Sequence, residues 1–147
     1  MANFVYTHAA AELLKGNIDL DDGGDDIRVL LVDGDTTADT EKDVDNISAF
    51  STLSEISADG YSRQAIANEA VAEDEANDRG EFDGDDVSFT FTADPGAIAA
   101  AVVFKHDTDD DSSVPLAYID DGFPVSPGAN TLTIEWNAEG IIQATTT

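Results

Sequence analysis

The stretch IAAAVVFKH, residues 98–106, decides the fold class because it is apolar at almost every position. The turn sequence Asp94-Pro95-Gly96 precedes it, and an Asp-rich segment, residues 107–113, follows it. A short apolar run between turn signals is typical of a strand that is buried on both faces. The sequence therefore predicts a central strand at this position.

Further strand patterns surround this stretch on both sides. In residues 87–91, VSFTF, and residues 132–136, LTIEW, apolar and polar side chains alternate, which predicts half-buried strands. In residues 114–119, Pro115 places the start of the predicted strand toward a sheet edge. The remaining predicted strands are residues 27–32 (IRVLLV) and residues 141–144.

Short helical elements are predicted in the first third of the chain. Thr7 is a candidate N-cap for a helix over residues 8–15, and Gly16 is its natural end. Apolar residues recur every third position within residues 44–56, which favours small helical turns, with a capping box from Thr52 to Glu55.

Two segments in the middle of the chain are harder to assign. Residues 61–71 alternate weakly, which favours a strand, although their alanines also allow a helix. Residues 72–86 are highly acidic and contain Gly80 and Gly84, so we expect a solvated loop.

These patterns predict a mainly β fold: an antiparallel β-sandwich or jelly-roll-like domain with a short N-terminal helix. A length of 147 residues fits one domain over residues 1–147. The segment 1–16 carries Phe4 and Tyr6 before the helix, and we expect these two aromatic residues to contribute to contacts with a neighbouring subunit.

Acidity is the strongest compositional feature. The chain has 32 Asp and Glu against 6 Lys and Arg, for a net charge of -26. Self-repulsion on this scale weakens a compact fold, and salt relieves it as the Debye length falls to about 3 Å near 1 M. The composition therefore indicates a protein that works in brine or in a very salty cytoplasm.

The composition also argues against several classes of protein. With no cysteine, the chain forms no disulfide and no thiolate metal site. We expect no signal peptide, no membrane span and no binding to nucleic acid or anionic lipid, since a phosphate-binding surface needs Lys and Arg. No cofactor motif is present, so no cofactor is expected.

Candidate sites for metal ions or catalysis are sparse. Asp107, Asp109, Asp110 and Asp111 are the best candidates for a hard cation, although dense Asp loops arise readily in so acidic a chain. His8 and His106 are the only imidazoles and belong to no recognisable catalytic motif, so we do not expect an enzyme. Asn46-Ile47-Ser48 is a glycosylation sequon of a kind that often occurs by chance.

Several motifs together resemble small structural proteins of tailed phages. They are Asp59-Gly60-Tyr61-Ser62-Arg63-Gln64-Ala65, Asn77-Asp78-Arg79 with Phe82, the apolar run 99–105, Ile18-Asp19-Leu20 with residues 26–32, and Ile134-Glu135-Trp136-Asn137 with Glu139-Gly140-Ile141. The resemblance covers nearly the whole chain and implies a β-rich virion component of the head or tail. Combined with the acidity, it implies a tailed virus of a haloarchaeon.

The resulting expectation is a capsid decoration or head-turret subunit. It would form a homo-oligomer on the major capsid protein or another virion protein, on the outer surface of a particle assembled in the host cytoplasm. The alternatives are a tail component, such as a tube, baseplate or fibre-associated protein, a small halophilic ligand-binding β domain or enzyme, and a calcium-dependent adhesive module.

The charge generates a direct prediction for stability. As NaCl is lowered from molar to millimolar concentration, we expect the melting temperature, followed by circular dichroism, to fall because repulsion between carboxylates is less screened. A melting temperature that does not change with NaCl would contradict the assignment to a salty environment.

Overall fold

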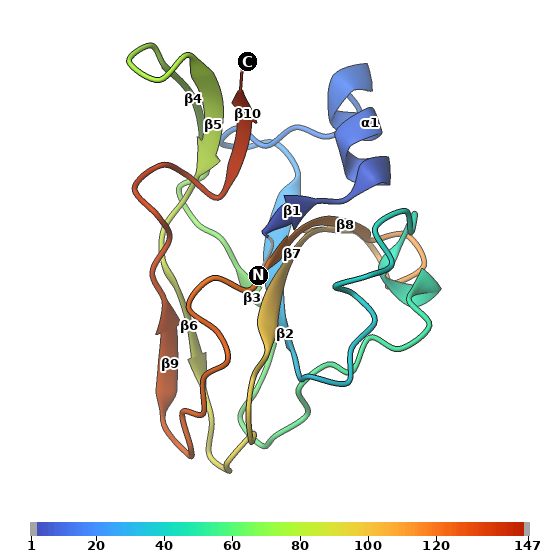
Figure 1. Ribbon diagram of the computed structural model, residues 1–147, viewed down its shortest axis with the longest axis vertical. Helices are drawn as coiled ribbons and strands as arrows, with labels where there is room; N and C mark the ends of the chain where they lie inside the picture. The colour runs from blue at the N-terminus through green and yellow to red at the C-terminus, as the bar shows by residue number, and fades with distance from the viewer. Residues whose placement is uncertain (1–2, 146–147) are drawn as a thin grey trace.

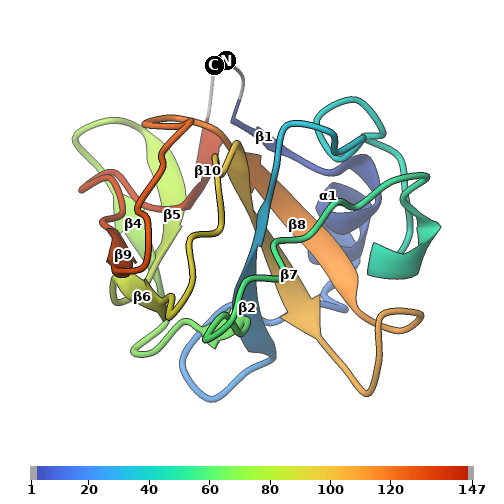
Figure 2. The same ribbon diagram turned by 90° about the horizontal axis from the view of Figure 1, so that it is seen from below.

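The computed structural model describes residues 3–145 and confirms a mainly β, sandwich-like fold. Strands make up 34% of the structure and helical residues 8%, in three antiparallel sheets and one short helix. A five-stranded sheet lies in the middle of the molecule, with a second layer of strands on one face and the helix and long loops on the other (Figure 1 and Figure 2).

The central sheet has the strand order β1-β8-β7-β2-β3. Its members are β1 (Phe4–Val5), β8 (Val114–Ile119), β7 (Ala100–His106), β2 (Asp26–Val32) and β3 (Gln64–Ala65). β2 and β7 pair over seven consecutive residues, from Asp26 opposite His106 to Val32 opposite Ala100. Residues 29–32 of β2 and 100–104 of β7 are entirely buried, as the apolar runs predict.

The second layer consists of a three-stranded sheet, β10-β5-β4, and a two-stranded sheet, β6-β9. The bounds are β4 (Ala70–Asp74), β5 (Arg79–Asp83), β6 (Val87–Thr90), β9 (Thr131–Ile134) and β10 (Ile142–Thr145). β5 leads into β6, and β9 leads toward β10, so the two small sheets follow one another along the same layer (Figure 1). Trp136 lies at the junction, where its backbone N–H donates to Asp86 Oδ1 at 3.0 Å and its Nε1 to the Asp85 carbonyl at 2.9 Å.

The opposite face of the central sheet is covered by α1 (Thr7–Lys15) and by the loop that contains the 3-10 turn η1 (Ile47–Ala49), as Figure 2 shows. Tyr6 anchors this layer. Its ring is entirely buried against Phe50, and its hydroxyl donates to the Ala38 carbonyl at 2.8 Å.

The predicted end of the helix is confirmed, and its predicted start is wrong. Gly16 has φ 76°, and the N–H groups of Gly16 and Asn17 donate to the Leu13 and Glu12 carbonyls, which closes the last turn. The N-cap is Tyr6 rather than Thr7, because the Tyr6 N–H is bonded to the Leu116 carbonyl and strand β1 therefore passes directly into the helix.

Within residues 44–56, only one helical turn forms, and the capping box from Thr52 to Glu55 is wrong. The chain instead runs extended beside the end of β2, where the Ile56 N–H donates to the Leu31 carbonyl and Glu55 forms a bridge with Val32. The apolar period of three is used for packing, since Ile47, Phe50 and Ile56 are all buried.

The predictions for residues 61–86 also need correction. Only Gln64–Ala65 forms a strand within 61–69, and the expected acidic loop is largely the hairpin β4–β5. Arg79 allows this acidic segment to pair, because its guanidinium lies 2.8 Å from Asp74 and 3.3 Å from Glu139.

Pro115 does not lie on an outermost strand, because β8 is placed between β1 and β7. The proline is tolerated since β1 covers only Ala117 and Tyr118, and since the pairing of β7 with β8 shifts register at Val103 and Phe104, opposite Pro115.

Tyr61 joins the two layers of strands. Its ring stacks on Phe89 and Phe91 of the second layer at centroid distances of 5.9 and 6.2 Å. Its hydroxyl accepts from the Leu31 N–H of the central sheet at 3.0 Å and donates to Glu55 Oε1 at 2.9 Å. Burial raises the pKa of Tyr61, so the phenol stays neutral and both hydrogen bonds persist at ordinary pH.

The Tyr61→Phe variant tests this link. It retains the ring and removes the hydroxyl, so we expect the free energy of unfolding to fall by about 1–2 kcal/mol because the Leu31 N–H loses its partner. Chemical denaturation in molar salt measures the change. As a control, Tyr61→Leu also removes the stacking on Phe89 and Phe91, and a smaller loss for Leu than for Phe would contradict this account.

Arg63 ties two acidic segments to the central sheet. It donates to both carboxylate oxygens of Glu55 and of Asp110 and lies over the Phe104 ring. The hydrogen bond from Arg63 holds the pKa of Asp110 below its usual range. Since the folded-state pKa is lowered, the stabilisation from Asp110 is present above the unfolded pKa, near pH 4, and is lost as the pH falls further.

The Arg63→Met variant retains an apolar stem over Phe104 and removes the charge. We expect a loss of about 1–2 kcal/mol near neutral pH, which is modest because the ion pairs are partly exposed. The gap between wild type and variant should begin to narrow as the pH falls below about 4, and should narrow further as the pH falls through the lowered pKa of Asp110. Denaturation curves across pH 3 to 7 measure it, and a gap that stays constant with pH would be inconsistent with this pairing.

Candidate functional site

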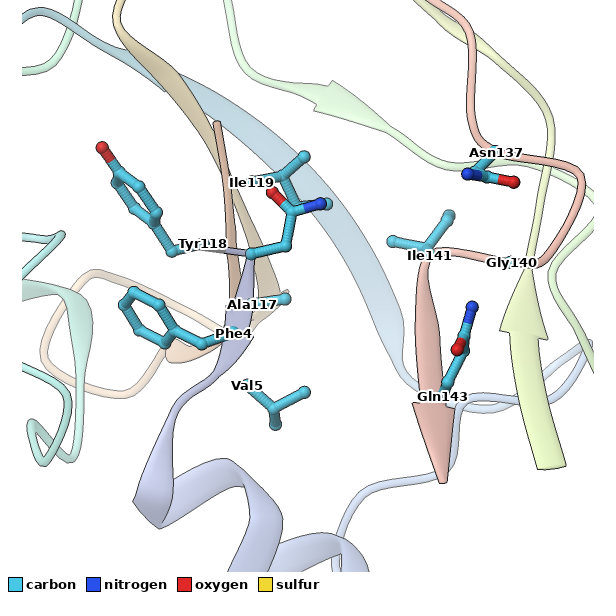
Figure 3. Close-up of a pocket in the computed structure, with 10 residues that line it drawn as sticks. Phe4, Val5, Ala117, Tyr118, Ile119, Asn137, Gly140, Ile141 and Gln143 are labelled. Carbon is cyan, nitrogen blue, oxygen red and sulfur yellow. The ribbon is translucent and has the colours of Figure 1, made fainter. Parts of the chain in front are cut away.

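A groove lies between β1 and β10 in the described part of the chain (Figure 3). It has a volume of about 370 Å³. Ten residues line it: Asn3, Phe4, Val5, Ala117, Tyr118, Ile119, Asn137, Gly140, Ile141 and Gln143. β1 is the outermost strand of the central sheet and β10 that of the three-stranded sheet, so the groove marks the open border between the two layers.

On the β1 side, the aromatic rings and the aliphatic side chains lie on opposite sides of the strand. Val5 and Ile119 point toward the groove, whereas the rings of Phe4 and Tyr118 lie on the other side of β1 (Figure 3). These two rings stack at 5.4 Å, and Lys42 Nζ lies 4.4 Å from the centre of the Phe4 ring. Burial raises the pKa of Tyr118 to about 12, and the Asp39 and Asp120 carboxylates add to this shift, so the phenol is uncharged at neutral pH.

On the β10 side, the wall depends on a tight approach of two backbones. Gly140 has φ 87°, and a Cβ atom there would lie 2.8 Å from the Phe82 carbonyl oxygen. The Ile141 N–H donates to that same oxygen at 2.7 Å. The Gln143 amide nitrogen donates to the Glu139 carbonyl at 2.9 Å, which holds its side chain along the wall.

The groove continues along the open border toward β9. Two smaller depressions of about 100 and 160 Å³ follow, lined in part by Phe123, Ile134 and Trp136. This lower end carries Asp121 and Glu135. The part between β1 and β10 is therefore less charged than its continuation.

The absence of charge from its lining is the main property of this groove. None of the ten lining residues is acidic or basic, although the chain has 32 Asp and Glu in 147 residues. The lining offers apolar surface from Val5, Ile119 and Ile141 and amides from Asn137 and Gln143. Such a surface suits contact with another uncharged surface.

Of the two residues expected to make contacts, the structure places only one beside the groove. Phe4 is partly buried on β1 and lines the groove. Tyr6 has no exposed surface and belongs to the core, so an intermolecular contact through its side chain is not supported. Residues 1 and 2 of the expected contact segment 1–16 lie outside the described residues.

The acidic loop that was the best candidate for a cation uses its carboxylates internally. Asp107 accepts from the Thr108 N–H, Asp109 from Ser112, Asp110 from Arg63, and Asp111 from the Ser48 hydroxyl. Among residues 3–145, no group of three or more acidic or imidazole side chains is arranged to hold a metal ion.

The two histidines have different partners. His8 Nδ1 lies 3.2 Å from Asp45, and the His106 ring packs edge-on against Phe104.

Within the described part of the chain, no helix is long and apolar enough to cross a membrane.

Most of the groove was missed from sequence, because the signal for it is not specific. Its walls come largely from three stretches without Asp, Glu, Lys or Arg, residues 3–11, 112–119 and 140–145, but a longer stretch of this kind, residues 122–134, lies elsewhere in the chain. These three stretches are far apart in sequence, and only the folded chain brings them to one border.

Searches with this chain found no matching protein-family model, no matching curated protein and no matching solved structure. The uncharged groove is therefore the observation from the structure that bears most directly on function.

Proposed function

We propose that this chain is a structural subunit of the particle of a halophilic tailed virus, most directly a capsid decoration or head-turret subunit on the major capsid protein. The observation that supports this function best is the uncharged groove at the open border of an otherwise acidic sandwich. Together with the chain-wide resemblance to small phage structural proteins, it indicates a subunit that works by contact with other proteins.

The distribution of charge fits a subunit packed at high local density on a shell. A net charge of -26 keeps such a surface hydrated and repels neighbours, so stable contacts need surface without carboxylates. The groove supplies such surface, and many weak contacts on a symmetric particle add through multivalency.

The chemistry of the groove favours contact over catalysis. Its polar side chains are amides, and the Tyr118 phenol, on the other side of β1 (Figure 3), is held neutral at ordinary pH by burial. General acid or base catalysis needs a group that titrates near the working pH, and none of the ten lining residues supplies one.

Immunogold electron microscopy tests the proposed function. Antibodies against the purified chain would be applied in molar salt to virus particles purified from cells that carry its gene. We expect gold on the particle heads, because the proposed subunit is mounted on the outer surface of the capsid. Preimmune serum is the control.

The position of the label separates the alternatives. Gold confined to tails would favour a tail component. Particles without label, from cells in which the chain is expressed, would contradict a role in the virion.

A further inference from the structure

We infer that the groove is a dimer contact, in which β10 pairs edge to edge with β10 of a second copy of this chain across a two-fold axis. The inference rests on the proposed structural function and names the first partner of that same groove. This strand pairing would join the β10-β5-β4 sheets of the two copies into one continuous sheet.

The first argument is that β10 presents an open edge. It pairs with β5 on one side and is the last strand of its sheet on the other. In an antiparallel pair, every second residue directs its N–H and C=O away from the neighbouring strand, so β10 offers unpaired backbone groups along the groove. An open edge of this kind readily accepts another strand.

The second argument is the charge along the competing edges. β10 reads Ile142-Gln143-Ala144-Thr145 and has no charge. β4, at the opposite edge of the same sheet, carries Glu73 and Asp74, and its Val71 N–H already donates to the Asp21 carboxylate. The other edge strands are uncharged as well, but β1 and β3 have only two residues each. β9 lies beside Asp121 and Glu135, and its partner β6 directly follows Asp85 and Asp86.

These differences select β10 as the edge for self-association. Two copies that each carry a charge of -26 repel each other, and like charges directly opposite in a strand pair destabilise it. The copies therefore approach at the lowest electrostatic cost where the edge is uncharged. Molar salt lowers the remaining repulsion, because the Debye length is about 3 Å near 1 M.

The third argument is self-complementarity. A two-fold dimer needs a patch that fits itself, and an antiparallel pair formed by one strand and its own copy meets this condition with backbone hydrogen bonds alone. Gln143, Ala144 and Thr145 are exposed in the single chain. In the dimer, this segment of one copy would pair with the same segment of the second copy. Val5 and Ile119, which point into the groove beside β10, supply apolar surface for the second copy to cover (Figure 3).

The test compares matched alanine variants by light scattering on a sizing column in molar NaCl. Ala144→Asp places like charges at the contact on β10. Ala72→Asp makes the same exchange at an exposed alanine on β4, the opposite edge of the same sheet. Circular dichroism and the melting temperature establish that both variants are folded.

We expect wild type and Ala72→Asp to elute at twice the 15.5 kDa mass of one chain, and Ala144→Asp to show half the wild-type mass. Three results would overturn the inference: a wild-type chain that is monomeric at every concentration tested, an Ala144→Asp variant that remains dimeric, or a dimer lost in Ala72→Asp instead. If Ala144→Asp does not fold, Gln143→Glu replaces it at the neighbouring exposed position of β10.

This outcome is independent of the gold labelling. Unlabelled particles together with a dimer lost in Ala144→Asp would reject the virion role and retain the β10 contact. Labelled heads together with a chain of 15.5 kDa in solution would retain the virion role and reject the β10 contact.

Discussion

The pairing of β2 with β7 is the constraint on which the rest of the structure depends. Seven residue pairs bring together the two most apolar runs of the chain, and both strands are covered on both faces. A sheet buried in this way needs a layer on each side, because either face alone would leave apolar side chains in water. The second layer of strands and the layer of α1 with its loops meet this need.

Charge is partitioned around this core. The few cations of the chain all lie against a defined partner: Arg28 on Asp26, Arg63 on Glu55 and Asp110, Arg79 on Asp74 and Glu139, Lys15 on Glu12, Lys105 on Asp25, and Lys42 on the Phe4 ring. Arg63, Arg79 and Lys105 tie acidic segments to the sheets, whereas Lys15 and Arg28 pair within their own helix or strand. The net charge of -26 that remains predicts a dependence of the stability of the fold on salt.

The open border between β1 and β10 is where the fold leaves an uncharged surface. Short strands border it on both sides, since β1 has two residues and β10 has four, so the two layers do not close into a barrel. A fold stabilised by its central sheet can leave this border open without exposing its core. The same opening provides an uncharged surface on a molecule that otherwise repels its neighbours.

The sequence by itself determined the β class and the central strands, because apolar runs and alternation are local properties. The dependence on salt stays a prediction from the net charge. The sequence predicted the strands over residues 27–32, 87–91 and 114–119 to within one residue at each end, whereas the strands predicted over 98–106 and 132–136 are observed at Ala100–His106 and Thr131–Ile134. It missed the hairpin β4–β5, because this acidic segment is also held by long-range contacts, namely the pairing of β5 with β10 and the ion pair of Arg79 with Glu139. The sequence predicted that Tyr6 contacts another subunit. Only its packing against Phe50 and its hydrogen bond to the Ala38 carbonyl place it in the core. The groove, likewise, is assembled from residues 3–5, 117–119 and 137–143, and long-range strand pairing alone decides that these meet.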